Sequence, residues 1–282
     1  METLKLLIDG LGIPESPRWH EDRLWFCNWI AQEIVAVGLD GTTESFPVPE
    51  QGQLMGYSIA WQPDGRLLMT GDRLRRREAD GSMAVLADQK ANEIVVDGHG
   101  NVYLDGADFD FSGGEAPKPG YIKLLTPDGR LRQVAGDIEF PNGMIITPDN
   151  KTLIIAESFA GRLTAFDIEP DGSLSGRRTF AENLGPDGIT LDSEGAVWVS
   201  AGGFAVARVA PGGEVLQRVE LPDDRAPFAV MLGGPDRRTL FVLTAEWHLD
   251  SSVKENLDRL TNGPRSGEIL TMPVAVPGAG RP

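Results

Sequence analysis

The sequence predicts an all-β fold, a six-bladed β-propeller with four-stranded blades. Three observations lead to this prediction. A two-strand pattern recurs six times along 282 residues, glycine and proline are abundant at 34 and 20 residues, and the copies start 35 to 50 residues apart. Such intervals are typical of propeller blades. We therefore expect one domain spanning residues 1–282, in preference to a β-sandwich followed by a second domain.

Each copy consists of a short apolar run, a turn and a second apolar run. In the second copy, residues 57–61 are followed by Pro63-Asp64-Gly65 and then by residues 67–69. Proline presets φ and glycine or asparagine adopts left-handed conformations, so these segments favour hairpin reversals. Further strand-like runs follow each hairpin and give about four strands per copy. Residues 4–8 belong to no copy, and we expect them to complete the last blade beside residues 268–274.

The charge balance limits the possible partners. The chain has 26 Lys and Arg against 42 Asp and Glu, a net charge of −16. Nucleic-acid affinity depends on cations that neutralise phosphates, so a nucleic-acid partner is excluded. No apolar stretch is long enough to cross a membrane, and the first residues do not resemble a signal peptide. We expect a cytoplasmic protein without a membrane partner. Its one cysteine, Cys27, lies in an apolar run and is expected to be buried.

The first residue of each hairpin holds a special position in a propeller. Inner strands line the central channel, so equivalent residues on six inner strands form a ring around the axis. Two of these ring residues are carboxylates and two are carboxamides, and buried charges need a counter-charge or a metal. The ring residues are Glu15, Tyr57, Asn92, Asn142, Asp187 and Phe228.

An oxygen-only ligand set without thiolates predicts a hard divalent ion on the central axis. Ca²⁺ is the first candidate, with Mg²⁺, Mn²⁺ or Zn²⁺ as alternatives. Only three or four protein ligands are available, so coordination positions stay open for water and substrate. Prolines precede four ring residues, and small residues follow three of them. The alternative interpretation is that Pro-Asn-Gly and Pro-Asp-Gly are ordinary turns.

Two long connections are expected at the same end of the channel as the ring. They span residues 105–120 and 246–267, and they are expected to form walls for a substrate. His248 in the second connection is a candidate substrate-binding residue. Lys90, two residues before Asn92, is another, because its ammonium could stabilise a developing negative charge. For both residues, a solvent-exposed surface position is the alternative.

At these residues the chain resembles the senescence-marker-protein, gluconolactonase and luciferin-regenerating-enzyme family. The resemblance runs from Glu15-Ser-Pro-Arg-Trp19 through Phe140-Pro-Asn-Gly143 and Pro186-Asp-Gly-Ile189 to residues 276–280. It implies one divalent ion held by Glu15, Asn142 and Asp187, with Asn92 as a further ligand or substrate contact. It also implies hydrolysis of a lactone, with Asp187 as the catalytic proton acceptor.

The substrate side departs from the family pattern. Members with a sugar-lactone preference look like Arg-x-Asn-Asp where this chain has Lys90-Ala-Asn92-Glu93. Tyr57 and Phe228 make part of the ring apolar and are expected to contact a less hydroxylated lactone. The expected partner is therefore a small lactone, a sugar lactone or a related cyclic ester. The alternatives are a noncatalytic propeller that binds a ligand or partner around a structural metal, and another hydrolase or lyase on this scaffold.

Overall fold

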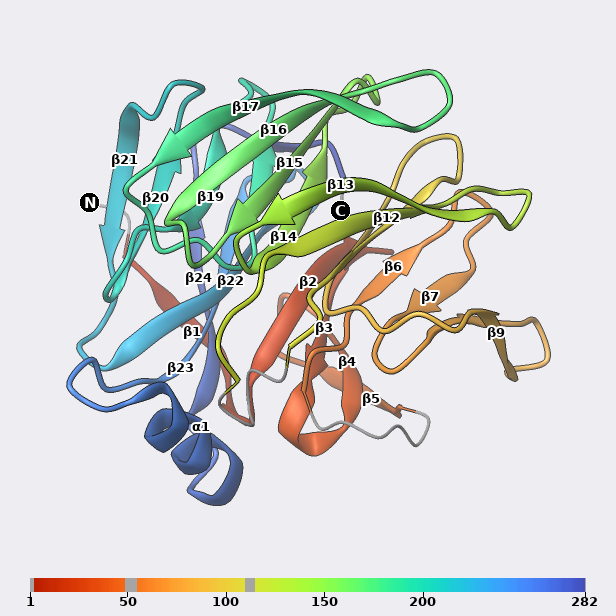
Figure 1. The fold of residues 1–282 in the computed structure, drawn as a ribbon. Helices are drawn as coiled ribbons and strands as arrows, with labels where there is room; N and C mark the ends of the chain where they lie inside the picture. The colour runs from red at the N-terminus through yellow and green to blue at the C-terminus, as the bar shows by residue number, and fades with distance from the viewer. Residues whose placement is uncertain (1–2, 49–54, 110–114, 282) are drawn as a thin grey trace.

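The computed structural model describes residues 3–48, 55–109 and 115–281, and it confirms the six-bladed propeller. Six antiparallel sheets follow one another around a central channel (Figure 1). Each sheet has four strands in the expected order, and one sheet gains a fifth short strand. Four-stranded sheets packed around an axis leave only short edges, which explains why the hairpin pattern repeats.

The first four blades are each continuous in sequence, and the first strand of each is the innermost. Blade 1 has β2 (Pro14–His20), β3 (Arg23–Asn28), β4 (Glu33–Val37) and β5 (Thr43–Pro47). Blade 2 has β6 (Ile59–Trp61), β7 (Leu67–Met69), β8 (Leu74–Arg77) and β9 (Met83–Ala87). Blade 3 has β10 (Ile94–Val96), β11 (Val102–Gly106), β12 (Gly120–Leu125) and β13 (Leu131–Ile138). Blade 4 has β14 (Pro141–Ile146), β15 (Thr152–Glu157), β16 (Arg162–Ile168) and β17 (Leu174–Glu182).

The last two blades use both ends of the chain. Blade 5 has β18 (Thr190–Asp192), β19 (Val197–Ser200), β20 (Ala205–Val209) and β21 (Val215–Glu220). Blade 6 has β22 (Arg225–Gly233), β23 (Thr239–Glu246), β24 (Gly267–Pro273) and β1 (Lys5–Leu11). As predicted, the N-terminal strand β1 pairs with β24 and closes the ring of blades. A short strand β25 (Gly278–Ala279) pairs with the inner strand β18.

The hydrophobic core is divided among the spaces between blades. Six clusters of buried residues each join two neighbouring blades; one, for example, packs Ile145 and Ile154 of blade 4 against Leu191 and Val199 of blade 5. Both faces of a blade are therefore buried, and apolar side chains on both faces stabilise the ring. Cys27 lies in one such cluster, fully buried as expected.

The two long connections contain regular secondary structure. The connection 246–267 contains a helix, α1 (Val253–Asn262), which the sequence analysis missed. Its N-terminus has a capping box, in which Ser252 and Glu255 bond each other's backbone N–H, and this Ser-x-x-Glu pattern is a readable helix signal. In the connection 105–120, Asp105 belongs to β11, while residues 110–114 lie outside the described residues. No helix in the described part of the chain has the length and apolarity to span a membrane.

Candidate functional site

The ring residues stand where the inner strands begin or are irregular. Glu15, Asn142 and Phe228 each lie at a break in strand pairing within β2, β14 and β22. Tyr57, Asn92 and Asp187 precede the first regular residue of β6, β10 and β18. β-Bulges turn side chains away from the regular alternation. An irregular entry into the inner strand therefore directs these residues differently from the rest of the strand.

Two glycines bring neighbouring inner strands unusually close. A Cβ on Gly143 would lie 2.6 Å from the Asp187 carbonyl oxygen and 2.8 Å from the Ile189 nitrogen. A Cβ on Gly188 would lie 2.4 Å from the Cβ of Ala229. No side chain fits either position without moving backbone. The small residues after the ring positions therefore allow blades 4, 5 and 6 to approach one another closely at the channel.

Glu15, Asn142 and Asp187 come together at the channel. Glu15 is only 4% exposed and Asn142 8% exposed. Burial, and next the charge of Asp187, raise the pKa of Glu15 well above its usual value. Burial, and next the charge of Glu93, raise the pKa of Asp187 to about 7, while a hydrogen bond from Asn142 acts against that rise. The three side chains that the sequence singled out as metal ligands thus interact in the folded protein.

This cluster has the character of a cation site. The Oδ1 atom of Asp187 is buried and has no hydrogen-bond partner among the described residues. The Asn142 amide nitrogen also lies 3.4 Å from Ser158 Oγ, a long hydrogen bond. Within the described ranges, no three His, Cys, Asp or Glu side chains form a group that could hold a metal. The predicted set contains only two carboxylates and takes its third oxygen from an amide. An unpartnered buried oxygen beside a second carboxylate fits a divalent ion.

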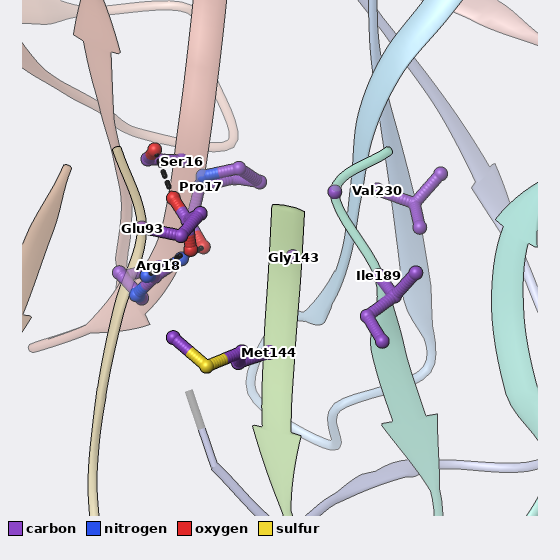
Figure 2. A pocket seen from close by; sticks show the side chains of 9 residues that line it. Ser16, Pro17, Arg18, Glu93, Gly143, Met144, Ile189 and Val230 are labelled. Carbon is purple, nitrogen blue, oxygen red and sulfur yellow. Dashed lines mark hydrogen bonds and ion pairs between the residues drawn. The ribbon is translucent and has the colours of Figure 1, made fainter. Parts of the chain in front are cut away.

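A third carboxylate, Glu93, lies at the same place and was missed by the sequence analysis. Its Oε1 accepts a hydrogen bond from Ser16 Oγ, and its Oε2 lies 3.1 Å from Arg18 Nη2 (Figure 2). Glu93 and Arg18 are both buried. The guanidinium also donates to Ser58 Oγ and to the Ile94 carbonyl. The ion pair therefore compensates Glu93, while Glu15 and Asp187 have no ion-pair partner among the described residues.

Figure 2 shows this pair beside a very small cavity in the channel, with space of about 10 Å³, enough for about one water molecule. Inner-strand residues of five blades line it: Ser16, Pro17, Arg18, Glu93, Gly143, Met144, Gly188, Ile189 and Val230. The signal for Glu93 and Arg18 was present in the sequence, because Glu93 follows a ring residue and Arg18 belongs to the Ser-Pro-Arg segment after another.

In three blades, a polar side chain at or just after the end of the second strand holds the segment that leads into the inner strand. It does so by accepting a backbone N–H group. In blade 3, Asp105 Oδ1 accepts the N–H groups of Asn92 and Glu93 at 2.9 and 2.6 Å. In blade 4, Glu157 Oε2 accepts the N–H of Glu139 at 2.8 Å, and in blade 2 Thr70 Oγ1 accepts that of Ser58 at 2.8 Å. Burial raises the pKa of Asp105 well above its usual value. Asp105 is therefore a positioning residue for Asn92 and Glu93.

Tyr57 is the clear correction to the predicted site. It is fully buried, and its hydroxyl donates toward the carbonyl oxygens of Asn28 and Glu33 at 3.2 and 3.3 Å. It packs in the cluster between blades 1 and 2. A large aromatic ring at this entry position gains more by burial between two blades than by facing the channel. Tyr57 is a core residue, and the prediction that it contacts the substrate is wrong.

The other predicted substrate contacts are half-buried or exposed. Phe228 is half-buried, its carbonyl accepts the Gly188 N–H at 2.8 Å, and its ring lies edge-on to Trp247 at 5.9 Å. Asn92 is half-buried and Lys90 is exposed. His248 Nε2 lies 2.6 Å from Glu246 Oε1. In the described part of the chain, His248 and Lys90 form no hydrogen bond or ion pair with the acidic cluster, so their substrate roles stay predictions.

An aromatic row borders Asn142 and was not predicted. Phe140, two residues before Asn142, stacks on Phe159 with ring centroids 4.2 Å apart, and Phe109 lies 5.9 Å from Phe140. Phe159 follows Ser158, the hydrogen-bond partner of Asn142. Its ring is 47% exposed. The acidic cluster is therefore bordered on one side by apolar surface.

Comparison with known proteins identifies a family for this chain. The family described as the SMP-30/Gluconolactonase/LRE-like region matches residues 13–246. A pentonolactonase of Haloferax volcanii is 30% identical, over 99% of this chain and 96% of that protein. A 6-deoxy-6-sulfogluconolactonase of Pseudomonas putida is 26% identical, over 100% of this chain and 98% of that protein.

Solved structures show the same fold. A luciferin-regenerating enzyme superposes with a TM-score of 0.81 and 19% identity, over 99% of this chain and 98% of that one. A calcium-binding protein, regucalcin, from Agrobacterium tumefaciens superposes with a TM-score of 0.78 and 22% identity, over 99% of this chain and 96% of that one.

Proposed function

Because the chain belongs to the SMP-30/gluconolactonase/LRE-like family, we propose that it is a metal-dependent lactonase, a carboxylic ester hydrolase that opens a cyclic ester. The observation that carries this proposal is the convergence of Glu15, Asn142 and Asp187, with the Oδ1 of Asp187 buried and unpartnered. Relatives of nearly the same length are named for lactone substrates.

Glu15, Asn142 and Asp187 would hold one divalent ion, and Ca²⁺ is our first candidate. The donors are all oxygen atoms, as hard cations require, and one similar structure is described as a calcium-binding protein. When bound, the ion supplies Lewis-acid polarisation of the lactone carbonyl. It would also hold two carboxylates ionised that burial otherwise pushes toward their neutral forms.

Asp187 acts as the general base. It accepts a proton from a water molecule whose oxygen forms a bond to the carbonyl carbon. The bond between that carbon and the ring oxygen then breaks, and Asp187 returns the proton to the leaving oxygen. One lactone and one water therefore become one hydroxy acid. Its half-exposed position at the channel end gives Asp187 access to both the water and the substrate.

The residues around the cluster select and orient the lactone. Asp105 accepts the backbone N–H of Asn92, and the Asn92 carboxamide would contact the lactone. Lys90, which is exposed and two residues before Asn92, would offer positive charge to the developing oxyanion. Phe228 and the rings of Phe140 and Phe159 present apolar surface on either side. This surface favours a lactone that is less hydroxylated than an aldonolactone.

A pH-drop assay with a panel of sugar, aliphatic and aromatic lactones tests the function. It is run on the chelated protein and after addition of Ca²⁺, Mg²⁺, Mn²⁺ or Zn²⁺. We expect turnover only with an ion, and loss on chelation without loss of the β-sheet circular dichroism spectrum. Unfolding on chelation, with no turnover of any lactone, would instead favour a noncatalytic propeller with a structural metal. Turnover of a non-lactone ester alone would favour another hydrolase. A cytoplasmic location stays a prediction.

A further inference from the structure

A second, larger cavity lies on the channel away from the acidic cluster. It has a volume of about 500 Å³, within the range of small-molecule sites. Its lining residues come from hairpin turns, from the far ends of inner strands and from the C-terminal segment: Arg18, Trp19, His20, Ala60, Trp61, Val96, Pro148, Arg237, Ala279, Gly280 and Arg281. Three of these are arginines, one is a histidine, and none is a carboxylate.

Two of the arginines, Arg237 and Arg281, have no ion-pair partner among residues 3–48, 55–109 and 115–281. Arg237 is desolvated, its Nε is buried without a hydrogen-bond partner, and no ion pair forms to its guanidinium within the described residues. A Cβ on Gly278 would lie 3.3 Å from that Nε, so the C-terminal segment packs directly on it. The Arg281 guanidinium reaches blade 3, where a Cβ on Gly98 would lie 3.3 Å from its Nη2. Unpaired guanidinium groups beside a cavity are suited to bind an anion.

Three carboxylates of the neighbouring turns have local partners, and Glu21 lies 3.8 Å from His20 Nε2. Asp97 accepts hydrogen bonds from His99 and Asn101, Asp149 from Thr147 and Lys151, and Asp192 is paired with Arg208. The net charge of the chain is −16. Long-range electrostatics in such a chain do not favour a cavity lined by arginines without ion pairs.

Aromatic rings form one wall of the cavity. His20 stacks on Trp61 with centroids 4.0 Å apart and an interplanar angle of 17°. Trp61 lies edge-on to Trp25, and Trp19 stacks on Phe241. Rings fixed in this way present a rigid flat surface, which suits a planar or apolar body next to a charged group.

We propose that this cavity binds an organic anion, a carboxylate, phosphate or sulfonate group attached to a flat apolar body, held by Arg237 and Arg281 against the Trp61 wall. Arg18 lines both this cavity and the small cavity beside Glu93. The anion site is separate from the proposed metal site, and its occupant does not take part in lactone hydrolysis.

The test uses a pair of fluorescent probes with the full-length protein. 8-Anilinonaphthalene-1-sulfonate carries a sulfonate on an aromatic body, and N-phenyl-1-naphthylamine is its neutral counterpart. We expect saturable binding of the sulfonate probe with one site per chain. Arg237→Gln and Arg281→Gln should each raise its Kd about tenfold, because each removes a charge-assisted contact. Neither substitution should change the Kd of the neutral probe.

Arg130→Gln is the matched control, since it removes the same charge from an exposed arginine that lies 3.7 Å from Asp128. It should leave the Kd of the sulfonate probe unchanged. Phenyl phosphate should displace the probe at lower concentration than inorganic phosphate, because only phenyl phosphate reaches the aromatic wall. Arg237→Lys keeps the charge and carries the test if Arg237→Gln does not fold.

Equal Kd values for the sulfonate probe in wild type, Arg237→Gln, Arg281→Gln and Arg130→Gln would overturn the proposal. So would an equal loss of affinity for the neutral probe, or failure of both phosphates to displace the sulfonate probe. Lactone turnover is measured in the same variants and should equal that of the wild type. Failure of the anion site is therefore distinguishable from failure of the proposed lactonase function.

Discussion

The acidic cluster and the second cavity differ in the sign of the charge that they carry. Glu15, Glu93 and Asp187 gather where the inner strands begin, with Arg18 as their one ion-pair partner in the described chain. At the second cavity, Arg237, Arg281 and His20 gather with no lining carboxylate. Arg18 lines both cavities. The propeller places equivalent positions in a ring, but the residue types chosen at each level decide what the ring can bind.

Burial acts on both regions in the same physical way. It raises the pKa of Glu15 and Asp187, and it lowers the pKa of His20 and Arg237. In each case the charged form loses hydration that the protein does not replace. Each region would therefore be stabilised by a ligand of opposite charge, a cation at the acidic cluster and an anion at the basic cavity.

The largest expected effect comes from removing the base of the acidic cluster. Asp187→Asn keeps the shape of the side chain but cannot accept a proton, so we expect lactone turnover to fall about 10²–10⁴-fold. The measurement is the initial rate at saturating divalent ion. Asp149→Asn, in an exposed hairpin turn, is the control and should retain full activity. Turnover of Asp187→Asn within threefold of wild type would contradict the assignment of Asp187.

The next effect tests Arg18, the residue shared by the two cavities. Arg18→Met leaves the buried Glu93 carboxylate unpaired beside Glu15 and Asp187, so we expect a loss of about 3–5 kcal/mol in the free energy of unfolding. Arg18→Met with Glu93→Gln removes both charges and should lose less than Arg18→Met alone. Urea denaturation in the presence of chelator measures all variants. A double variant as unstable as Arg18→Met would show that the ion pair is not the reason.

The third prediction concerns how the stability of the protein depends on pH through the buried Asp187 carboxyl. The pKa of Asp187 is raised from 3.8 to about 7. Protonated Asp187 therefore contributes to the free energy of unfolding, fully below pH 3.8, and this contribution is lost as the pH rises through 7. Without metal, wild type should lose stability relative to Asp187→Asn over that interval, by on the order of 1.4 kcal/mol per pH unit at most. Urea denaturation between pH 4.5 and 7.5 measures the difference. A saturating divalent ion should flatten it, and a difference that does not vary with pH would disprove the assigned shift.

The smallest effect concerns Tyr57, a ring position that belongs to neither cavity. Tyr57→Phe removes hydroxyl hydrogen bonds to the Asn28 and Glu33 carbonyl groups, so we expect a loss of about 1 kcal/mol in the free energy of unfolding. The KM for a lactone should stay within twofold of wild type, because the ring is buried in the core. A severalfold rise in KM with unchanged stability would return Tyr57 to the substrate site.

Much of the fold was predictable because it depends on local patterns. Turn residues between apolar runs marked five of the six inner hairpins, and the spare strand at residues 4–8 predicted the closure that β1 and β24 make. The helix α1 was missed although Ser252 and Glu255 form a readable capping box. The reason is that a long polar connection between strands was interpreted as a loop throughout its length.

The site was only partly predictable because alignment identifies equivalent positions but not side-chain directions. Glu15, Asn142 and Asp187 lie close enough to interact, and their role as metal ligands stays a prediction, whereas Tyr57 turns into the interface between blades 1 and 2. Glu93 takes a place at the channel one residue beyond the predicted ring position, where Arg18 and Ser16 hold it. The irregular backbone at the start of each inner strand sets the direction of these side chains. A periodic sequence pattern does not predict it.

The sequence by itself determined the number of blades, the strand order and the excess of acidic residues, because each depends on residue type and spacing along the chain. Only the tertiary structure decided which carboxylates share the channel, which of them Arg18 compensates, and that Arg237 and Arg281 meet at a second cavity. Those outcomes depend on desolvation and on contacts between residues far apart in sequence. Burial and partnership of a charge are properties of the packed ring, not of any one of its repeats.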